Sequence, residues 1–327
     1  MLKYNAIIVL EDLNMGFMRG RQKVEKQVYQ KFEKMLIDKL NYLADKKKDP
    51  SEVGGVLNAY QLTSKFDSFA KLGRQSGFLF YIPAWNTSKI DPVTGFVNLF
   101  DTQYKSDGKA KMFFSKFKSI SYNKDKNWFE FSFNYNDFTS KAEGTKTEWT
   151  VCTNGERIEN FRNGETSNQW SGRTINLSQE FNTLFDGYGI DFTKDLQNSI
   201  CSQSKKGFFK QLLHLFKLTV QMRNSNTETE EEKGKKEKKD FIISPVCVDD
   251  KYYNSDIEAE KGKDEEGNWK SELPVNADAN GAYNIARKGL MILNHIKQSS
   301  NPSKKQEYDL TNKAWLNFVQ KGSVEEK

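Results

Sequence analysis

Cysteine and histidine are scarce in this chain, which has three Cys and two His among 327 residues. The cysteines, Cys152, Cys201 and Cys247, are far apart and none forms a CxxC pair. This excludes a zinc ribbon or zinc finger, because those sites need clustered Cys and His ligands. An odd number of unclustered thiols also favours a reducing cytosol over a disulfide-bonded secreted protein.

Other common signatures are missing as well. No window approaches 18 consecutive apolar residues and no signal peptide opens the chain, so neither a membrane span nor secretion is expected. No GxxxxGK[ST] loop, GxGxxG fingerprint or Ser-His-Asp constellation supports a nucleotide hydrolase or a dehydrogenase. Aromatic residues make up 13% of the chain, which excludes wholesale disorder. The net charge of +6 permits an anionic partner without proving one.

The first 83 residues predict a strand, a helix and a second strand. Residues 4–10 form a short β-branched run, and the apolar residues 78–82 predict a second buried strand that ends at Pro83. Residues 24–43 between them carry an amphipathic helical stripe, and a further helix is expected at 66–72. This order predicts a parallel β-α-β crossover.

The middle of the chain has a different pattern. Aromatic residues alternate with polar ones over 129–135, the period of a strand with one wet face. Asn154 and Gly155 predict a type I′ hairpin between 149–153 and 156–161.

The rest of the chain predicts helices and one charged loop. Residues 208–222 predict an amphipathic helix, and the charged run 227–239 predicts a surface loop. A last long helix follows residue 276, with its apolar stripe at Ile285, Ala286, Leu290 and Leu293. Both histidines, His214 and His295, fall on apolar helical stretches and are interpreted as packing residues.

Two carboxylates stand where chemistry is expected. Glu11 follows a buried strand, at the end of a parallel sheet where active sites collect, and Asp278 opens a helix. Two such carboxylates could share divalent metal ions for phosphodiester hydrolysis. Alternatively, Glu11 is the first solvated residue after the strand, and Asp278 is a helix cap or a partner of the helix macrodipole. Spacing alone favours these simpler interpretations.

Several longer motifs change the balance between these interpretations. They are VLEDLNMGF, GGVLNAYQLT, SGFLFYIPAWNTSKIDPVTGFVN, QMRNSN, DFIISPV and LPVNADANGAYNIARKG. Together and in this order they resemble the C-terminal part of the subtype V-A (Cpf) family of CRISPR effectors, which are RNA-guided DNA endonucleases. The resemblance implies an α/β fold: an incomplete RNase H-like (RuvC-like) layer formed by 1–83 and 269–327, with a large inserted α+β Nuc domain at 84–268.

The resemblance also implies roles for single residues. Glu11 and Asp278 match the second and third catalytic carboxylates of the RuvC-like domain, and would hold Mg²⁺ in a two-metal site. Arg223, Ser225 and Asp240 match a polar cluster of the Nuc domain beside that site.

Three basic residues are candidates for contacting the phosphates of the substrate. Arg223 is suited to clamping a phosphate through its planar fork, and Lys89 and Arg74 are two further candidate phosphate contacts. The alternatives are a basic residue at a helix C-terminus for Arg223, an ion-pair role for Asp240, and a solvated surface position for Lys89 and Arg74.

The sequence also departs from this family. Nothing in it resembles the first RuvC-like motif, whose strand ends in an Asp, or the guide-binding lobe. We therefore expect a bacterial cytoplasmic nuclease part that acts on DNA strands, is deficient alone, and meets guide RNA through an N-terminal lobe or a split partner. The alternatives are a non-catalytic nucleic-acid-binding remnant and another RNase H-like nuclease, such as a transposon-associated one.

Overall fold

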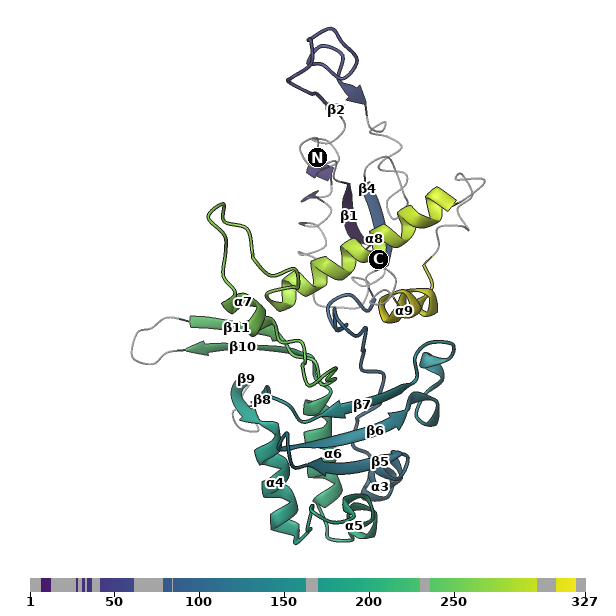
Figure 1. Cartoon of the computed structure of the whole chain (residues 1–327), viewed down its shortest axis with the longest axis vertical. Helices are drawn as coiled ribbons and strands as arrows, with labels where there is room; N and C mark the ends of the chain where they lie inside the picture. The colour runs from purple at the N-terminus through teal and green to yellow at the C-terminus, as the bar shows by residue number, and fades with distance from the viewer. Residues whose placement is uncertain are drawn as a thin grey trace. The chain divides into compact units, whose positions relative to one another are not determined.

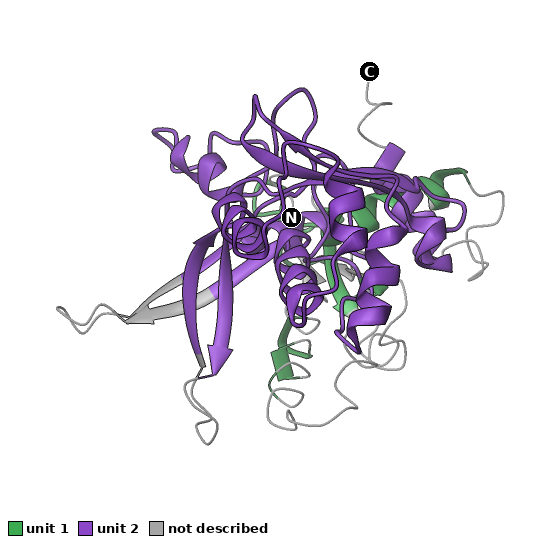
Figure 2. Ribbon diagram, turned by 90° about the horizontal axis from the view of Figure 1, so that it is seen from below, with its two compact units in different colours: residues 1–85, 285–310 green, residues 86–284, 311–327 purple. Residues whose placement is uncertain are grey.

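The chain folds into helices and several small sheets, which confirms a mixed α/β composition. The structure is a computed structural model that describes residues 7–12, 28, 31–32, 34–36, 42–61, 79–83, 85–162, 170–229, 236–298 and 310–321. Two compact units are present (Figure 2): Met1–Trp85 with Ile285–Leu310, and Asn86–Asn284 with Thr311–Lys327. Within the described residues, no helix combines the length and the apolar character needed to cross a membrane.

Unit 1 is built on a parallel strand pair, as the sequence predicts. Strand β1 (Ile8–Asp12) pairs in parallel with β4 (Leu79–Pro83), and Glu11 lies opposite Ile82. The strand therefore continues two residues beyond its expected end at Leu10. Helix α8 (Ala277–Gln298) packs against this pair through its C-terminal half (Figure 1). The small core of this unit consists of Ile82 and Ile292, with Ile7, Val9, Ile285, Leu293 and Leu310 packed around them.

The predicted apolar stripe of α8 is confirmed in part. Ile285 and Leu293 pack against the core of unit 1. Ala286 is exposed and Leu290 is 52% exposed, whereas Ile292, outside the predicted stripe, is buried. Polar side chains at i, i+4 and i+8 are buried on the helix and donate hydrogen bonds to backbone carbonyls. These are Asn280 to Ile90 (3.0 Å), Asn284 to Thr87 (2.9 Å) and Lys288 to Pro83 (2.7 Å). These hydrogen bonds satisfy backbone carbonyls at the end of β4 and in the segment after it, and they explain why this polar face of α8 is buried.

The predicted helix at 24–43 is wrong at its C-terminal end. Tyr42–Leu43 forms strand β2, which pairs with β3 (Tyr60–Gln61). The apolar stripe expected to be buried is exposed at Val28, Phe32 and Met35, which are each more than half accessible. The helix predicted at 66–72 lies outside the described residues.

A glycine brings α8 close to β1. A Cβ atom on Gly289 would lie 2.4 Å from Val9 Cγ2, whereas one on Gly281 of the same helix would meet only Ser88 Cβ, at 3.9 Å. We expect Gly289→Ala to lower the free energy of unfolding by about 1–2 kcal/mol, because overpacking outweighs the gain in helix propensity.

Gly281→Ala is the matched control for this prediction. It gains the helix propensity without a clash and is expected to raise the stability by up to about 1 kcal/mol. Chemical denaturation measures both variants. Equal stabilities would contradict the packing of α8 on β1.

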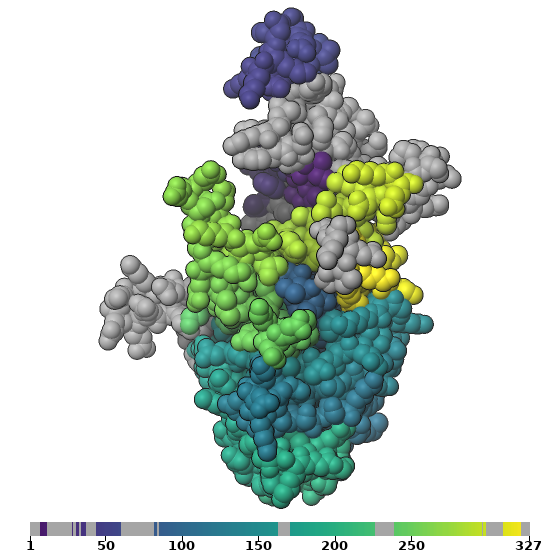
Figure 3. Space-filling model, viewed as in Figure 1, coloured from purple at the N-terminus to yellow at the C-terminus, as the bar shows by residue number. Residues whose placement is uncertain are grey.

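Unit 2 is organised around a three-stranded antiparallel sheet of β5 (Ser119–Asn123), β6 (Trp128–Asn134) and β7 (Glu148–Cys152). The predicted alternation is confirmed, because Phe129, Phe131 and Phe133 are buried while the residues between them are partly exposed. Helices α4 (Leu177–Tyr188) and α6 (Phe208–Thr219) pack on this aromatic face (Figure 1). In the space-filling view, these segments form one closely packed body (Figure 3).

Shorter helices complete unit 2. They are α3 (Asp107–Ser115), η2 (Tyr135–Asp137), η3 (Ser140–Ala142), α5 (Leu196–Ser202), α7 (Ser255–Glu260) and α9 (Asn312–Lys321). Helix α6 buries the side chains predicted for its stripe but ends at Thr219, three residues before the predicted end.

The hairpin predicted at Asn154-Gly155 does not form. Strand β7 pairs with β6, and β8 (Glu156–Arg162) pairs with β9 (Trp170–Asn176). A type I′ turn needs a positive φ at both central residues, but of this pair only Gly155 has one, at 64°. The Asn154 side chain is instead buried and donates to the Ser244 carbonyl, at 2.8 Å.

The charged run predicted as a loop is largely a β-ribbon. Strands β10 (Arg223–Thr229) and β11 (Lys236–Ile242) pair antiparallel, so both ends of the predicted loop at 227–239 are strand. A two-stranded ribbon tolerates charged side chains because the backbone N–H and C=O groups of its strands pair with each other, and this pairing does not require the side chains to be buried. Residues 230–235 lie outside the described residues.

Candidate functional site

Arg223, Ser225 and Asp240 are brought together by the β10–β11 ladder. Ser225 is the direct cross-strand partner of Asp240, and Arg223 lies two residues before Ser225 on the same strand. The two-residue period of a strand places all three side chains on one face. Arg223 Nε donates to Asp240 Oδ1 at 3.0 Å, and Nη2 donates to Asp240 Oδ2 at 2.6 Å. Arg223 therefore lies in a strand, which removes its alternative interpretation as a basic residue at a helix C-terminus.

Asp278 joins this cluster from the first turn of α8. Arg223 Nη2 donates to Asp278 Oδ1 at 2.9 Å. The cap interpretation of Asp278 is wrong, because Asn276 Oδ1 accepts the backbone N–H of Ala279 at 2.7 Å and so caps the helix. The Asp278 side chain is 75% exposed and that of Asp240 only 12%. Asp240 is thus mainly an anchor for the arginine, whereas Asp278 is open to solvent.

The two aspartates act on the arginine together. The hydrogen bonds from Arg223 to Asp240, and the charges of both carboxylates, raise the pKa of the Arg223 guanidinium. These bonds use Nε and Nη2. Among the described residues Nη1 makes no hydrogen bond, so two N–H donors of Arg223 are left for a ligand.

Buried polar residues that the sequence analysis did not single out hold the start of β10. Asn224 is fully buried, and its Oδ1 accepts the backbone N–H of Ile158 at 3.0 Å. Arg157 is also fully buried and donates to the carbonyls of Asn154 at 2.9 Å and Thr219 at 3.3 Å. Burial lowers the pKa of Arg157 to about 9. These bonds tie β8 to the end of α6 and fix the strand that carries Arg223.

A pocket of about 470 Å³ opens beside this cluster, within unit 2. Arg223, Ser225 and Lys89 all contribute to its wall, together with Lys217, which the sequence analysis did not single out. The remaining wall contains both polar and apolar side chains and consists of Asn86, Val97, Asn98, Thr102, Asn160, Val220, Gln221 and Met222. Cations with neutral hydrogen-bonding groups suit an anionic ligand. Arg74 lies outside the described residues.

In unit 1, Glu11 lies near the end of β1, close to a buried lysine. Lys288 is fully buried, and its ammonium group lies 4.1 Å from the ring centroid of Trp85. Burial lowers the pKa of Lys288 to about 7, against the opposing effect of the Glu11 carboxylate. The sequence analysis missed Lys288, since it stands in a helix like any solvated lysine.

The described residues do not by themselves complete a metal centre. No group of three or more His, Cys, Asp or Glu within this part of the chain is arranged to hold a metal ion. The exposed carboxylate of Asp278 and the carboxylate of Glu11 are the oxygen ligands that Mg²⁺ prefers. Each of the two residue types therefore suits the ion chemically.

The comparison with known families agrees with this chemistry. The family model of the RuvC nuclease domain matches residues 1–324. The chain belongs to the RuvC nuclease domain family. Membership of this family supports the conclusion that the chain is a nuclease, that is, a hydrolase. Nucleases of the RuvC type typically use divalent metals. The mixed α/β structure with small sheets is compatible with a RuvC-like fold.

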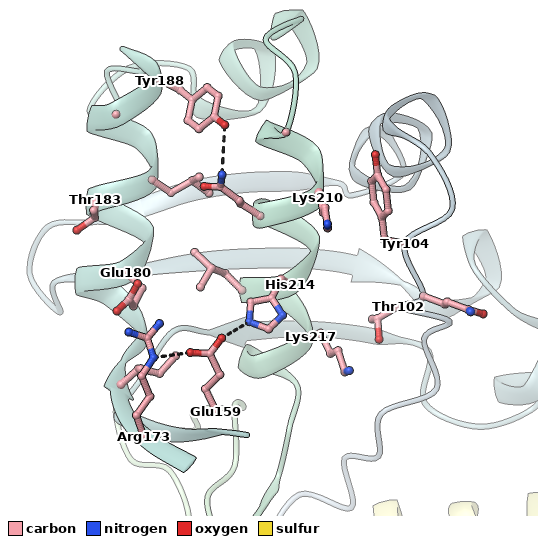
Figure 4. A pocket seen from close by; sticks show the side chains of 17 residues that line it. Thr102, Tyr104, Glu159, Arg173, Glu180, Thr183, Tyr188, Lys210, His214 and Lys217 are labelled. Atoms are coloured by element: carbon pink, nitrogen blue, oxygen red, sulfur yellow. Dashed lines mark hydrogen bonds and ion pairs between the residues drawn. The ribbon is translucent and has the colours of Figure 1, made fainter. Parts of the chain in front are cut away.

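A second pocket of this RuvC-type chain lies between α4, α6 and the segment 102–104 (Figure 4). Its volume is about 710 Å³. Glu159 stands between Arg173 Nε and His214 Nε2, at 2.6 Å from each. The packing role expected for His214 is wrong, because its side chain is 46% exposed and hydrogen-bonded. Burial alone would raise the pKa of Glu159, but the bonds from Arg173 and His214 outweigh it and lower this pKa.

The lowered pKa of Glu159 predicts a pH effect on stability. A carboxylate with a lowered folded-state pKa contributes stability above its unfolded pKa of about 4.3, and loses it as the pH falls through the folded value. We expect Glu159→Gln to cost about 0.5–1 kcal/mol at pH 7 and to flatten the fall in stability below about pH 4.3. Urea unfolding from pH 3 to pH 7 measures this. Glu143→Gln, at an exposed site, should match the unaltered chain, and an equal slope in both variants would contradict the role of Glu159.

Proposed function

We propose that the chain is the nuclease part of an RNA-guided DNA endonuclease of the subtype V-A CRISPR type, which hydrolyses DNA phosphodiester bonds with Mg²⁺ in antiviral defence. In this proposal, 1–83 and 269–327 form a RuvC-like layer and 84–268 is the inserted Nuc domain. Guide RNA would select the target by base pairing in a lobe outside this chain, so no base readout is needed here.

The observation that carries the proposal is the cluster of Arg223, Asp240 and Asp278. The β10–β11 ribbon and the start of α8 meet there, with Arg223 and Asp278 55 residues apart, and the residues are those that the family resemblance singles out. A structural ion pair needs only one carboxylate, whereas this arginine holds a largely buried one, Asp240, and an exposed one, Asp278. The exposed Asp278 and the neighbouring cationic pocket supply both a metal ligand and a phosphate site.

The residues have distinct roles in the proposed reaction. Arg223 would clamp a phosphate through Nη1 while Asp240 fixes its orientation. Lys89 and Lys217 would neutralise adjoining phosphates, and Ser225 would donate a hydrogen bond to a phosphate oxygen.

Metal ions complete the proposed reaction. Glu11 and Asp278 would hold Mg²⁺, which when bound activates water and stabilises the leaving oxygen. The third carboxylate would come from the first RuvC-like motif, on another piece of the enzyme.

The experiment is cleavage of labelled single-stranded DNA in Mg²⁺, with the chain alone and with a fragment that carries the first RuvC-like strand. We expect cutting in the mixture, and little by the chain alone. Robust cutting by the chain alone, abolished by Asp278→Ala, would retain the nuclease but overturn the expected deficiency. No cutting in either case would contradict the nuclease proposal.

A second candidate function is nucleic-acid binding without catalysis. It is favoured by the absence of a complete metal cluster among the described residues. It predicts salt-dependent retention on DNA as the sole activity.

A further inference from the structure

Two pockets of unit 2 share part of their walls. Thr102 and Lys217 line both the pocket beside Arg223 and the pocket between α4 and α6. We propose that the two pockets form one groove that binds single-stranded DNA, leading the strand away from Arg223 along the exposed face of α6. This inference rests on the proposed nuclease function and names a second binding region for its substrate.

Two lysines lie on the exposed face of α6. Lys210 and Lys217 are seven residues apart, and both are exposed. Such spacing places them on one side of the helix, with Lys210 and Lys217 about 10 Å apart along its axis. Figure 4 shows both lysines projecting from α6 on the side where Tyr104 lies. Neither lysine makes an ion pair within the described part of the chain, so their charge is available to phosphates.

The acidic residues of the groove do not cancel this charge. Glu159 is held by Arg173 and His214, so its charge is compensated within the wall. Glu180 is the other carboxylate of this pocket and lies on α4, on the far side from the lysines in Figure 4. The two lysines therefore give their side of the groove a local positive charge.

Two aromatic rings, one from the segment 102–104 and one from α4, line the larger pocket. Tyr104 is 37% exposed, and its hydroxyl donates to Asp107 at 2.9 Å. Tyr188 packs against Phe208, with 5.1 Å between ring centroids, and also lines the groove. Rings beside a line of cations are the pattern by which proteins bind single strands without reading sequence.

The dimensions also fit a strand rather than one small anion. The two volumes, about 470 and 710 Å³, far exceed the space needed for a single phosphate. At about 3.4 Å per nucleotide, the distance from Lys210 to Lys217 spans about three nucleotides of a stacked strand.

The test is binding of a fluorescein-labelled, mixed-sequence 15-nucleotide DNA to the full chain in EDTA, followed by anisotropy at several salt concentrations. We expect the unaltered chain to bind, and the double variant Lys210→Ala/Lys217→Ala to bind about five- to tenfold more weakly. The slope of log affinity against log salt should fall by about 1.4, since two phosphate contacts are lost. The matched control is Lys109→Ala/Lys124→Ala, which removes two exposed lysines that line neither pocket.

Stacking is tested separately at Tyr104. Tyr104→Ala should weaken binding about fivefold or more, whereas Tyr104→Phe keeps the ring and should bind like the unaltered chain. Absence of binding by the unaltered chain, or equal affinities for the two double-lysine variants, would overturn the groove. Because these assays contain no Mg²⁺, they measure DNA binding in the absence of cleavage. A failure of the nuclease proposal is therefore distinguishable from a failure of the groove.

Discussion

Asp278→Ala is expected to lower the rate of single-stranded DNA cleavage by at least about 10²–10³-fold, measured in Mg²⁺ with the complementing fragment present. The reason is the position of this carboxylate. It is 75% exposed, in the first turn of α8, and held through one oxygen by Arg223. Asp186→Ala, which removes an exposed carboxylate from α4, should leave the rate unchanged.

Asp278→Asn separates two roles of the residue. The amide oxygen can still accept the hydrogen bond from Arg223, but the negative charge that a divalent ion needs is lost. We expect Asp278→Asn to be as inactive as Asp278→Ala. Full activity of the Asn variant beside an inactive Ala variant would mean that Asp278 only orients Arg223.

Arg223→Ala is expected to lower the same rate by about 10²-fold, through loss of the phosphate clamp. Arg223→Lys should recover part of this, since it keeps the charge but not the planar fork. Pre-steady-state cleavage at saturating DNA separates the chemical effect from weaker binding.

Folding must be monitored in parallel, because Arg223 also pairs with the buried Asp240. Removing the arginine leaves that carboxylate without its bidentate partner, at a cost of about 1–3 kcal/mol in unfolding free energy. The double variant Arg223→Ala/Asp240→Asn should restore stability but not cleavage. Restored cleavage in the double variant would contradict a direct role for the guanidinium.

Strong local patterns predicted much of the fold. The alternation over 129–135 and the stripe of α6 each correspond to an observed element, because each pattern has one period and one buried face. The hairpin at Asn154 failed because tertiary hydrogen bonding to Ser244 outweighed a local turn preference. The prediction of a loop at 227–239 was wrong because side-chain charge is a weak guide to backbone pairing. Residues 223–229 pair with 236–242 through backbone hydrogen bonds, whatever the charge of their side chains.

The cluster itself could not be derived from spacing. Arg223 and Asp278 are 55 residues apart, and nothing in their separation indicates a contact. The motifs pointed to both residues, but the contribution of Lys217 to the same pocket depends on how α6 packs against the sheet. Asn224 and Lys288 are likewise buried because they donate hydrogen bonds to backbone carbonyls. The sequence does not reveal which carbonyls these are.

Whether Asp278 is a metal ligand, rather than only a partner of Arg223, is tested most directly by Mn²⁺ binding. Electron paramagnetic resonance measures the concentrations of free and bound Mn²⁺. The samples are the unaltered chain, Asp278→Ala and Asp186→Ala, each with the complementing fragment. We expect bound Mn²⁺ to fall at least about tenfold in Asp278→Ala and to stay unchanged in Asp186→Ala. Equal Mn²⁺ binding by all three proteins would contradict the assignment.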